Sequence, residues 1–104
     1  MVLNREVLGK QFRIYGTKEN PLFLAKDVAE WIEHSNASVM LSNVDKEEKV
    51  KLKNIYFENR TGGKGTWFLT EQGLYEVLFQ SSKPIAKQFK KEVKNILKQI
   101  RTTL

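Results

Sequence analysis

The C-terminal segment, residues 83–104, constrains the fold of this 104-residue chain more than any other feature. Large apolar residues recur there at spacings of four, four, three and four, namely Ile85, Phe89, Val93, Ile96 and Ile100. This is the period of one face of an α-helix. We therefore predict a continuous helix from residue 82 to about residue 102, with these five side chains buried against a hydrophobic core.

The same segment carries the whole net charge of the chain. It holds seven basic residues and one acid, Glu92, which gives +6, the net charge of the full sequence. Five of the basic residues recur at a second helical spacing: Lys87, Lys91, Lys94, Lys98 and Arg101. At about 100° per residue, this stripe is centred roughly 140° from the apolar one. One face can therefore pack while the other presents cations, which suits a polyanion such as a nucleic acid.

The N-terminal half predicts one hairpin followed by two helices. Residues 12–16 and 22–24 have the composition of short strands, and the polar residues between them are typical of a turn. Asp27 lies where the first helix should begin, so we expect its carboxylate to face the free N–H groups of that turn. On this basis Asp27→Asn should change stability little. Asn36 is placed to cap a second, short helix.

The C-terminal half predicts a second hairpin and two more helices. Residues 50–58 and 66–69 are the expected strands, joined by a glycine-rich tip at residues 60–65 that should project into solvent. Thr70 is placed to cap a helix over residues 71–80, with a core-facing stripe of Leu74, Tyr75, Leu78 and Phe79. Gly73 in its first turn would let another backbone approach closely. Pro84 fits the first turn of the last helix.

The predicted order of elements is β-β-α-α-β-β-α-α. Two hairpins without a β-α-β crossover indicate an α+β fold, with a small antiparallel sheet packed with about four helices. A length of 104 residues favours a single domain over residues 1–104.

Several function classes are disfavoured by the sequence. The chain has no cysteine, which excludes a disulfide scaffold and a thiol nucleophile, and His34 is its only histidine. One histidine cannot build a His-based metal cluster, and we expect His34 to be solvated or to cap the end of a helix. No apolar run is long enough to span a membrane. We therefore predict no catalytic residues and no metal site.

Two other basic groups are candidates for contacts with a ligand. Arg60 and Lys64 at the hairpin tip could touch a phosphate backbone. Lys49, Lys51 and Lys53 alternate, so on a strand they share one face, for which a solvated surface is the simpler interpretation. The aromatic residues of these strands, including Trp67 and Phe68, are expected to lie mostly in the core.

Several motifs resemble the Bro-N domain, the N-terminal module of phage and prophage antirepressors and baculovirus Bro proteins. Residues 23–29, FLAKDVA, are similar to its F-x-A-x-D-V-A opening, and residues 71–78, EQGLYEVL, are similar to E-x-G-L-Y-x-L. Residues 81–90, SSKPIAKQFK, match S-x-K-P-x-A-K-x-F-K, and Ile100-Arg101 matches a closing I-R. One departure is Glu92, where the family usually has Trp.

The resemblance implies a DNA-binding module of a transcriptional regulator in a phage or prophage, with neither enzyme activity nor a cofactor. Duplex DNA would be bound mainly by the last helix, through the five basic residues named above, with Arg60 and Lys64 as secondary contacts. The expected location is the cytoplasm of a bacterial host. The alternative is a protein-interaction module that sequesters a repressor or self-associates, with the last helix docking on an acidic partner surface.

Overall fold

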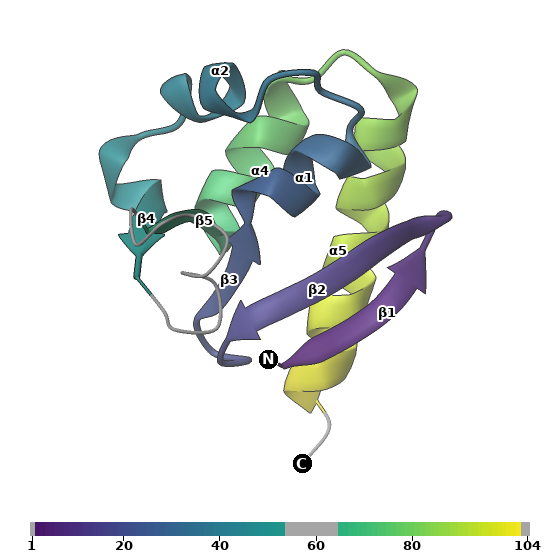
Figure 1. Ribbon diagram of the computed structural model, residues 1–104. Coiled ribbons are helices and arrows are strands. Elements are labelled where there is room, and N and C mark those ends of the chain that lie inside the picture. Colours follow the sequence, from purple (N-terminus) through teal and green to yellow (C-terminus); the bar gives the residue numbers. More distant parts are fainter. Residues whose placement is uncertain (1, 54–64, 103–104) are drawn as a thin grey trace.

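Five antiparallel strands form one sheet in the spatial order β1-β2-β3-β5-β4 (Figure 1). The structure is a computed structural model and describes residues 2–53 and 65–102. The strands are β1 (Leu3–Val7), β2 (Lys10–Gly16), β3 (Pro21–Leu24), β4 (Lys49–Leu52) and β5 (Thr66–Thr70). The predicted α+β class and antiparallel sheet are confirmed.

The first strand was not predicted. β1 pairs with β2 over its full length, from Leu3 opposite Ile14 to Val7 opposite Lys10. Its middle residues are polar and exposed because it is an edge strand, and only Val7 is buried. The turn between the two strands places both Leu8 and Gly9 at positive φ, 52° and 78°. This turn normally carries Asn-Gly or Asp-Gly, so Leu-Gly gave no hairpin signal.

The described helices are α1 (Ala25–Trp31), α2 (Ala37–Ser42), α4 (Glu71–Gln80) and α5 (Pro84–Thr102), with a short 3₁₀ turn η1 (Lys46–Glu48) before β4. Two of them, α2 and α4, begin at the capping residues predicted for them. The Asn36 side chain accepts a hydrogen bond from the Val39 N–H, and Thr70 accepts one from the Gly73 N–H. Both caps satisfy N–H groups that a helix leaves without a partner in its first turn.

Trp31 lies at the centre of the core. Its ring stacks against Phe12 of β2, with centroids 4.8 Å apart, and against Phe89 of α5, at 5.2 Å and an interplanar angle of 3°. Phe23 of β3 meets it edge-on at 6.2 Å. The indole N–H donates to the Gln11 carbonyl at 2.7 Å, so the one polar atom of the ring is satisfied. One side chain thus joins two strands and two helices.

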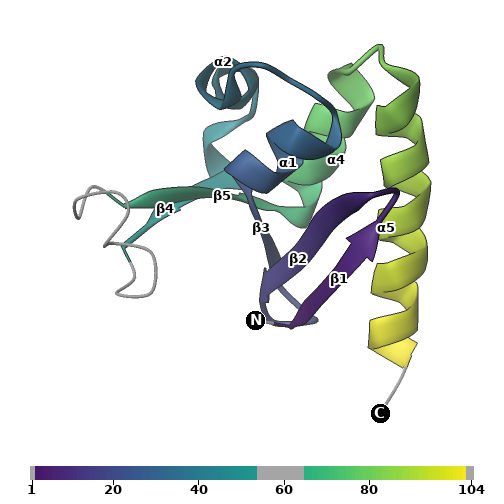
Figure 2. The ribbon, with the colours of Figure 1, turned by 45° about the vertical axis from the view of Figure 1, so that its right-hand side comes forward.

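The last helix is continuous, as predicted, but it begins at Pro84 and its buried set differs. Phe89, Val93 and Ile96 are buried, together with Ala86 and Leu97. Ile85 and Ile100 are only partly buried, so their predicted burial is wrong. Both lie near the ends of α5, where less of the neighbouring structure covers the helix. Figure 2 shows α5 along one side of the molecule, with β4 and β5 on the opposite side.

The predicted core stripe of α4 holds only in part. Leu74 and Leu78 are buried and Tyr75 is half-buried, but Phe79 is 81% exposed. Phe79 is rotated about 100° from Leu78 around the helix and leaves the face that packs. Gly73 behaves as predicted, because a Cβ there would lie 2.3 Å from the Glu48 carbonyl oxygen. The glycine lets η1 pack directly on the first turn of α4.

Asp27 lies in the first turn of α1, as predicted, but its carboxylate has a different partner. It is 3% exposed and is held by both nitrogens of the Arg13 guanidinium edge, Nε at 2.9 Å and Nη2 at 2.5 Å. The expected cap is therefore wrong: Asp27 binds a cation on β2 that no local pattern reveals. The hydrogen bonds from Arg13 also raise the pKa of its guanidinium.

The hairpin tip, including Arg60 and Lys64, lies outside the described residues, as does most of the predicted strand at 50–58.

Candidate nucleic-acid interface

The outer face of α5 is a row of four lysines. Lys87, Lys91, Lys94 and Lys98 are all exposed and recur at spacings of four, three and four along Pro84–Thr102. Within residues 2–53 and 65–102, none of the four side chains is held by a hydrogen bond or an ion pair. We call these four residues the lysine face. Glu92 lies about 100° around the helix from Lys91 and is half-buried.

The lysine face is held rigidly because the opposite side of the same helix is core. Phe89, Val93 and Leu97 are each at most 1% exposed and alternate with the lysines in sequence. A lysine placed between two buried residues of a helix cannot turn inward without breaking that packing. The four ammonium groups are therefore carried on a fixed backbone, while their own side chains remain free to adapt to a ligand.

Arg101, the fifth residue of the predicted stripe, is engaged within the molecule. Its guanidinium contacts the Glu71 carboxylate at 2.5 and 3.3 Å and donates to the Lys18 carbonyl at 3.0 Å. The pKa of Glu71 is lowered, first by these hydrogen bonds and then by one from the Tyr75 hydroxyl. Burial, together with the charge of Glu71, raises the pKa of Tyr75 to about 12. Arg101 thus ties the end of α5 to the start of α4.

Two other lysines of this segment also have partners. Lys83 donates to the Glu33 backbone carbonyl, which joins the start of α5 to the end of α1. The Lys90 Nζ lies 5.8 Å from the centroid of the Phe79 ring, and this lysine is half-buried. The cations of this segment therefore divide into two groups: some hold the helix in place, and the four of the lysine face point to solvent.

A second group of lysines predicted from the sequence lies on β4. The prediction that the neighbouring Trp67 lies in the core is wrong. Lys49 and Lys51 share a face of the strand, as their spacing predicts. Trp67 of β5, expected in the core, is 38% exposed and lies beside them. The sequence offered one signal for this site, an aromatic residue on the strand predicted to pair with the alternating lysines. A buried strand would show the same pattern.

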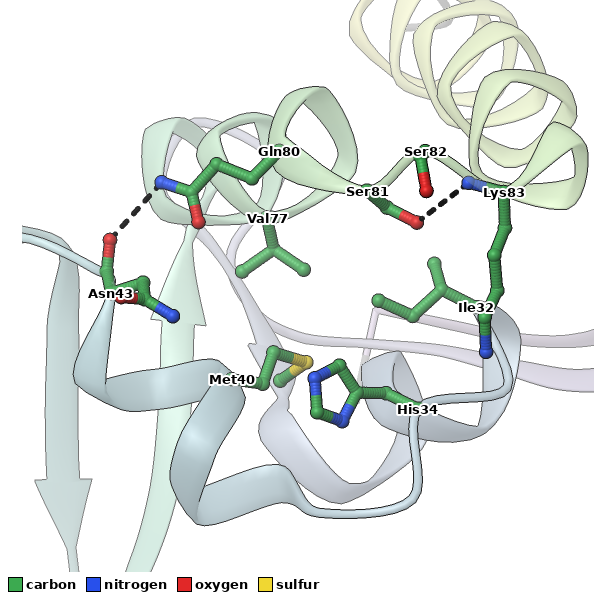
Figure 3. Close-up of a pocket in the computed structure, with 9 residues that line it drawn as sticks. All are labelled: Ile32, His34, Met40, Asn43, Val77, Gln80, Ser81, Ser82 and Lys83. Carbon is green, nitrogen blue, oxygen red and sulfur yellow. Dashed lines mark hydrogen bonds between the residues drawn. The ribbon is translucent and has the colours of Figure 1, made fainter.

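A pocket of about 260 Å³ lies between α1, α2 and α4 (Figure 3). Ile32, Met40 and Val77 form its apolar wall, and the polar lining is His34, Asn43, Gln80, Ser81, Ser82 and Lys83. His34 is half-buried, and its Nδ1 accepts a hydrogen bond from the Asn36 N–H at 3.0 Å, just before α2. Among the described residues that line this pocket there is no carboxylate to pair with His34 for acid–base chemistry.

No helix in the described part of the chain has the length and apolar character required to cross a bilayer. Across the same residues, histidines and carboxylates nowhere form the group of three needed to hold a metal ion.

Comparison with known proteins identifies the family. Residues 11–99 match the N-terminal domain of the BRO family. A Bro-N domain-containing protein of Invertebrate iridescent virus 6, 289L, is 27% identical to this chain over an alignment of 105 positions. The alignment covers 84% of this chain and 25% of the viral protein. This chain therefore spans about a quarter of the length of that relative. No solved structure matches it. Since the match covers most of the chain, the protein belongs to the BRO N-terminal domain family, as its motifs predict.

Proposed function

We propose that this chain is the DNA-binding domain of an antirepressor-type transcriptional regulator of a phage or prophage, and that it binds duplex DNA mainly through α5. The observation that carries the proposal is the lysine face, four exposed ammonium groups on one rigid helix with no acid among them. The BRO N-terminal domain family is associated with DNA binding in phage and baculovirus Bro proteins.

The chemistry of the lysine face favours the DNA backbone over the bases. An ammonium group binds a phosphate as a point charge, whereas bases are read best by bidentate Arg, Asn or Gln side chains. On α5 this geometry is offered by Arg101, which is already occupied by Glu71, and by Gln99, which lies about 100° around the helix from Lys98. The domain should therefore bind different duplex sequences with similar affinity and strong salt dependence. Arg60 and Lys64 remain proposed secondary contacts to phosphates.

A salt series on duplex DNA tests the proposal. If each of the four lysines neutralises one phosphate, log K should fall against log salt with a slope of about −3.6. The double variant Lys91→Gln/Lys94→Gln should reduce the magnitude of this slope by about two. The matched control is Lys26→Gln/Lys46→Gln, which removes the same charge from exposed positions on α1 and η1 and should leave the slope nearly unchanged.

Two results would contradict DNA binding by the lysine face. One is the absence of DNA retention by the wild-type domain at about 50 mM salt, where electrostatic binding is strong. The other is a double variant that binds as tightly as the wild-type domain, or a control pair that weakens binding by the same amount. Equal losses in both pairs would show that net charge matters and the position of the lysines does not.

A protein partner is the second candidate, and Phe79 is the observation that favours it. The Phe79 ring is 81% exposed at the end of α4, beside Lys90, and therefore offers a partner protein an apolar group to bury. Sequestration of a repressor, or self-association, would bury such a ring. Sedimentation of the wild-type domain and of Phe79→Ser, each with and without a cognate repressor, tests this role. Identical sedimentation of the two proteins in both conditions would count against it.

A further inference from the structure

Trp67 differs from the other tryptophan of the chain in its environment. Trp31 is fully buried and stacked, whereas Trp67 lies on β5 between Thr66 and the buried Phe68 and is 38% exposed. An indole is large, flat and mostly apolar, so leaving it in contact with water forgoes the burial that a core position would give it. Its flat faces are also what a nucleic-acid base stacks on in proteins that bind single strands.

Two lysines of β4 flank this ring. Lys51 pairs directly with Trp67 in the strand register, and Lys49 pairs with Leu69 two residues further along β5. Alternation therefore places both lysines on the same side of the sheet as the indole. Their Nζ atoms lie over the ring, 5.8 Å (Lys51) and 5.7 Å (Lys49) from its centroid, as in a cation–π contact. Lys53 follows directly after β4 and is exposed, so cations line the strand next to the ring.

The surrounding residues hold this arrangement in place. Lys49 donates to the Leu41 carbonyl at 2.8 Å, which fixes its ammonium group beside the ring. A Cβ at position 65 would lie 3.2 Å from the Lys51 Cγ, and Gly65 also has a φ of +88°. This glycine therefore leaves room for the Lys51 side chain along the start of β5. The preceding acid, Glu48, accepts a hydrogen bond from the Thr70 hydroxyl at 2.5 Å, and among the described residues no ion pair joins it to Lys51.

We infer that Trp67, Lys51 and Lys53 form a stacking site for an unpaired base, with Lys49 holding the indole from the β4 side. The base takes the place of the Lys51 ammonium over the exposed part of the ring, and the phosphates on either side of its nucleotide meet Lys51 and Lys53. The positive charges of Lys51 and Lys53 favour a polyanion. The flat Trp67 ring favours a polyanion whose bases have accessible π faces. Bases within a duplex are covered by their neighbours, so the occupant is a single-stranded segment.

This site extends the proposed function without depending on the lysine face. β4 and β5 lie on the side of the molecule opposite α5 (Figure 2), so one short strand cannot engage both surfaces along a straight path. The two sites should also bind different forms of nucleic acid. A duplex offers phosphates to α5, whereas only an unpaired region offers a base to Trp67. The two surfaces can therefore be tested separately.

Tryptophan fluorescence provides the direct test, with a twelve-residue oligothymidylate as the probe and a duplex of equal length as the comparison. Stacking on Trp67 should quench its emission, while the buried Trp31 contributes a constant background. Trp67→Leu should abolish the quenching and weaken oligothymidylate binding, followed by anisotropy of a labelled strand, by about 5- to 100-fold, the range typical of one stacked base. Trp67→Phe keeps an aromatic ring and should restore most of the affinity.

Matched variants separate stacking from general effects. Phe79→Leu removes another exposed aromatic residue that has a lysine beside it and should leave both quenching and affinity unchanged. Lys51→Gln should reduce the magnitude of the salt slope for the single strand by about 0.7, the value for one phosphate. Lys91→Gln/Lys94→Gln should weaken duplex binding and leave quenching of Trp67 by oligothymidylate intact.

The outcomes distinguish this inference from the proposed function. Oligothymidylate that binds Trp67→Leu as tightly as the wild-type domain, or that binds without quenching, overturns the stacking site. Duplex binding with a normal salt slope in the same experiments would leave the proposed role of α5 standing. Loss of duplex binding in Lys91→Gln/Lys94→Gln with quenching preserved supports both. Circular dichroism shows whether Trp67→Leu is folded; if it is not, Trp67→Phe and Lys51→Gln carry the test.

Discussion

Two regions of the molecule differ in how much their side chains should contribute to stability. The inner region is the aromatic group around Trp31, with Phe12 and Phe89, and the Arg13–Asp27 pair on the adjoining strand and helix. The outer region is the solvent side of α5, with the lysine face and the Arg101–Glu71 pair. In the inner region neighbours exclude water, so each deletion is costly. In the outer region water can solvate the groups that a deletion leaves behind, so each deletion should cost little stability.

The largest difference should come from a pair of phenylalanines. Phe89→Ala removes a fully buried ring that stacks on Trp31 and should lower the free energy of unfolding by about 3–5 kcal/mol. Phe79→Ala makes the same chemical change at an exposed position and should cost less than about 0.5 kcal/mol. Denaturant melts of both variants measure the difference. A loss below about 1 kcal/mol for Phe89→Ala would show that α5 does not complete the core.

The next effect concerns the inner ion pair. Asp27→Asn leaves Arg13 with one acceptor and places an amide NH₂ group against the guanidinium, so we expect a loss of about 1–3 kcal/mol. The cost stays below that of a fully buried pair because the Arg13 side chain is 32% exposed and can be hydrated. Glu30→Gln, at an exposed position of α1, is the control in the same urea melts. Equal stability of Asp27→Asn and Glu30→Gln would indicate that Asp27 acts as a local helix cap and that its contact with Arg13 adds little.

The outer ion pair should contribute less and should depend on pH. The pKa of Glu71 is lowered in the folded state, so its contribution is present above the unfolded value of about 4.5 and is lost as the pH falls through the folded value. Glu71→Gln should therefore cost at most about 1 kcal/mol at pH 7, with the difference from the wild-type domain vanishing in acid. Thermal melts between pH 7 and pH 3 check this. A cost that does not shrink as the pH falls below about 4.5 would indicate a packing role.

The smallest effect on stability should come from the lysine face. Lys91→Gln/Lys94→Gln changes two exposed side chains that have no partner in the described residues, so the free energy of unfolding should stay within about 0.5 kcal/mol. A small gain is expected at low salt, because like charges three residues apart on a helix repel each other. A melting temperature that falls by several degrees would show that these lysines make contacts that stabilise the folded domain.

The elements that the sequence predicts well are those set by local chemistry. Asn36, Thr70 and Pro84 act on the backbone of their own helices, and the apolar stripe of α5 follows from the helical period alone. The lysine face is local in the same sense. Its position on the outside follows once Phe89 and Val93 are known to face inward.

The predictions that failed concern partners distant in sequence. Asp27 is 14 residues from Arg13 and Glu71 is 30 from Arg101, so nothing near either carboxylate indicates its cation. The helical spacing places Phe79 in one stripe with Leu74 and Leu78, although only the packing of α4 decides how wide a face is covered. The candidate site divides in the same way. The lysines of α5 could be listed from their spacing, but the contact of Trp67 with two lysines depends on the register of β4 against β5.

The stacking of Phe89 on Trp31 also has a consequence for local opening of the chain. α5 cannot detach from the rest of the molecule without exposing Phe89, Val93 and Leu97 to water, so its amides should exchange with solvent only when the whole domain unfolds. The edge strand β1, of which only Val7 is buried, should exchange much faster. Most proteins place their binding groups on loops that open easily. Here the lysines proposed to meet DNA lie on a helix that we expect to exchange slowly, so a ligand would find their backbone already ordered.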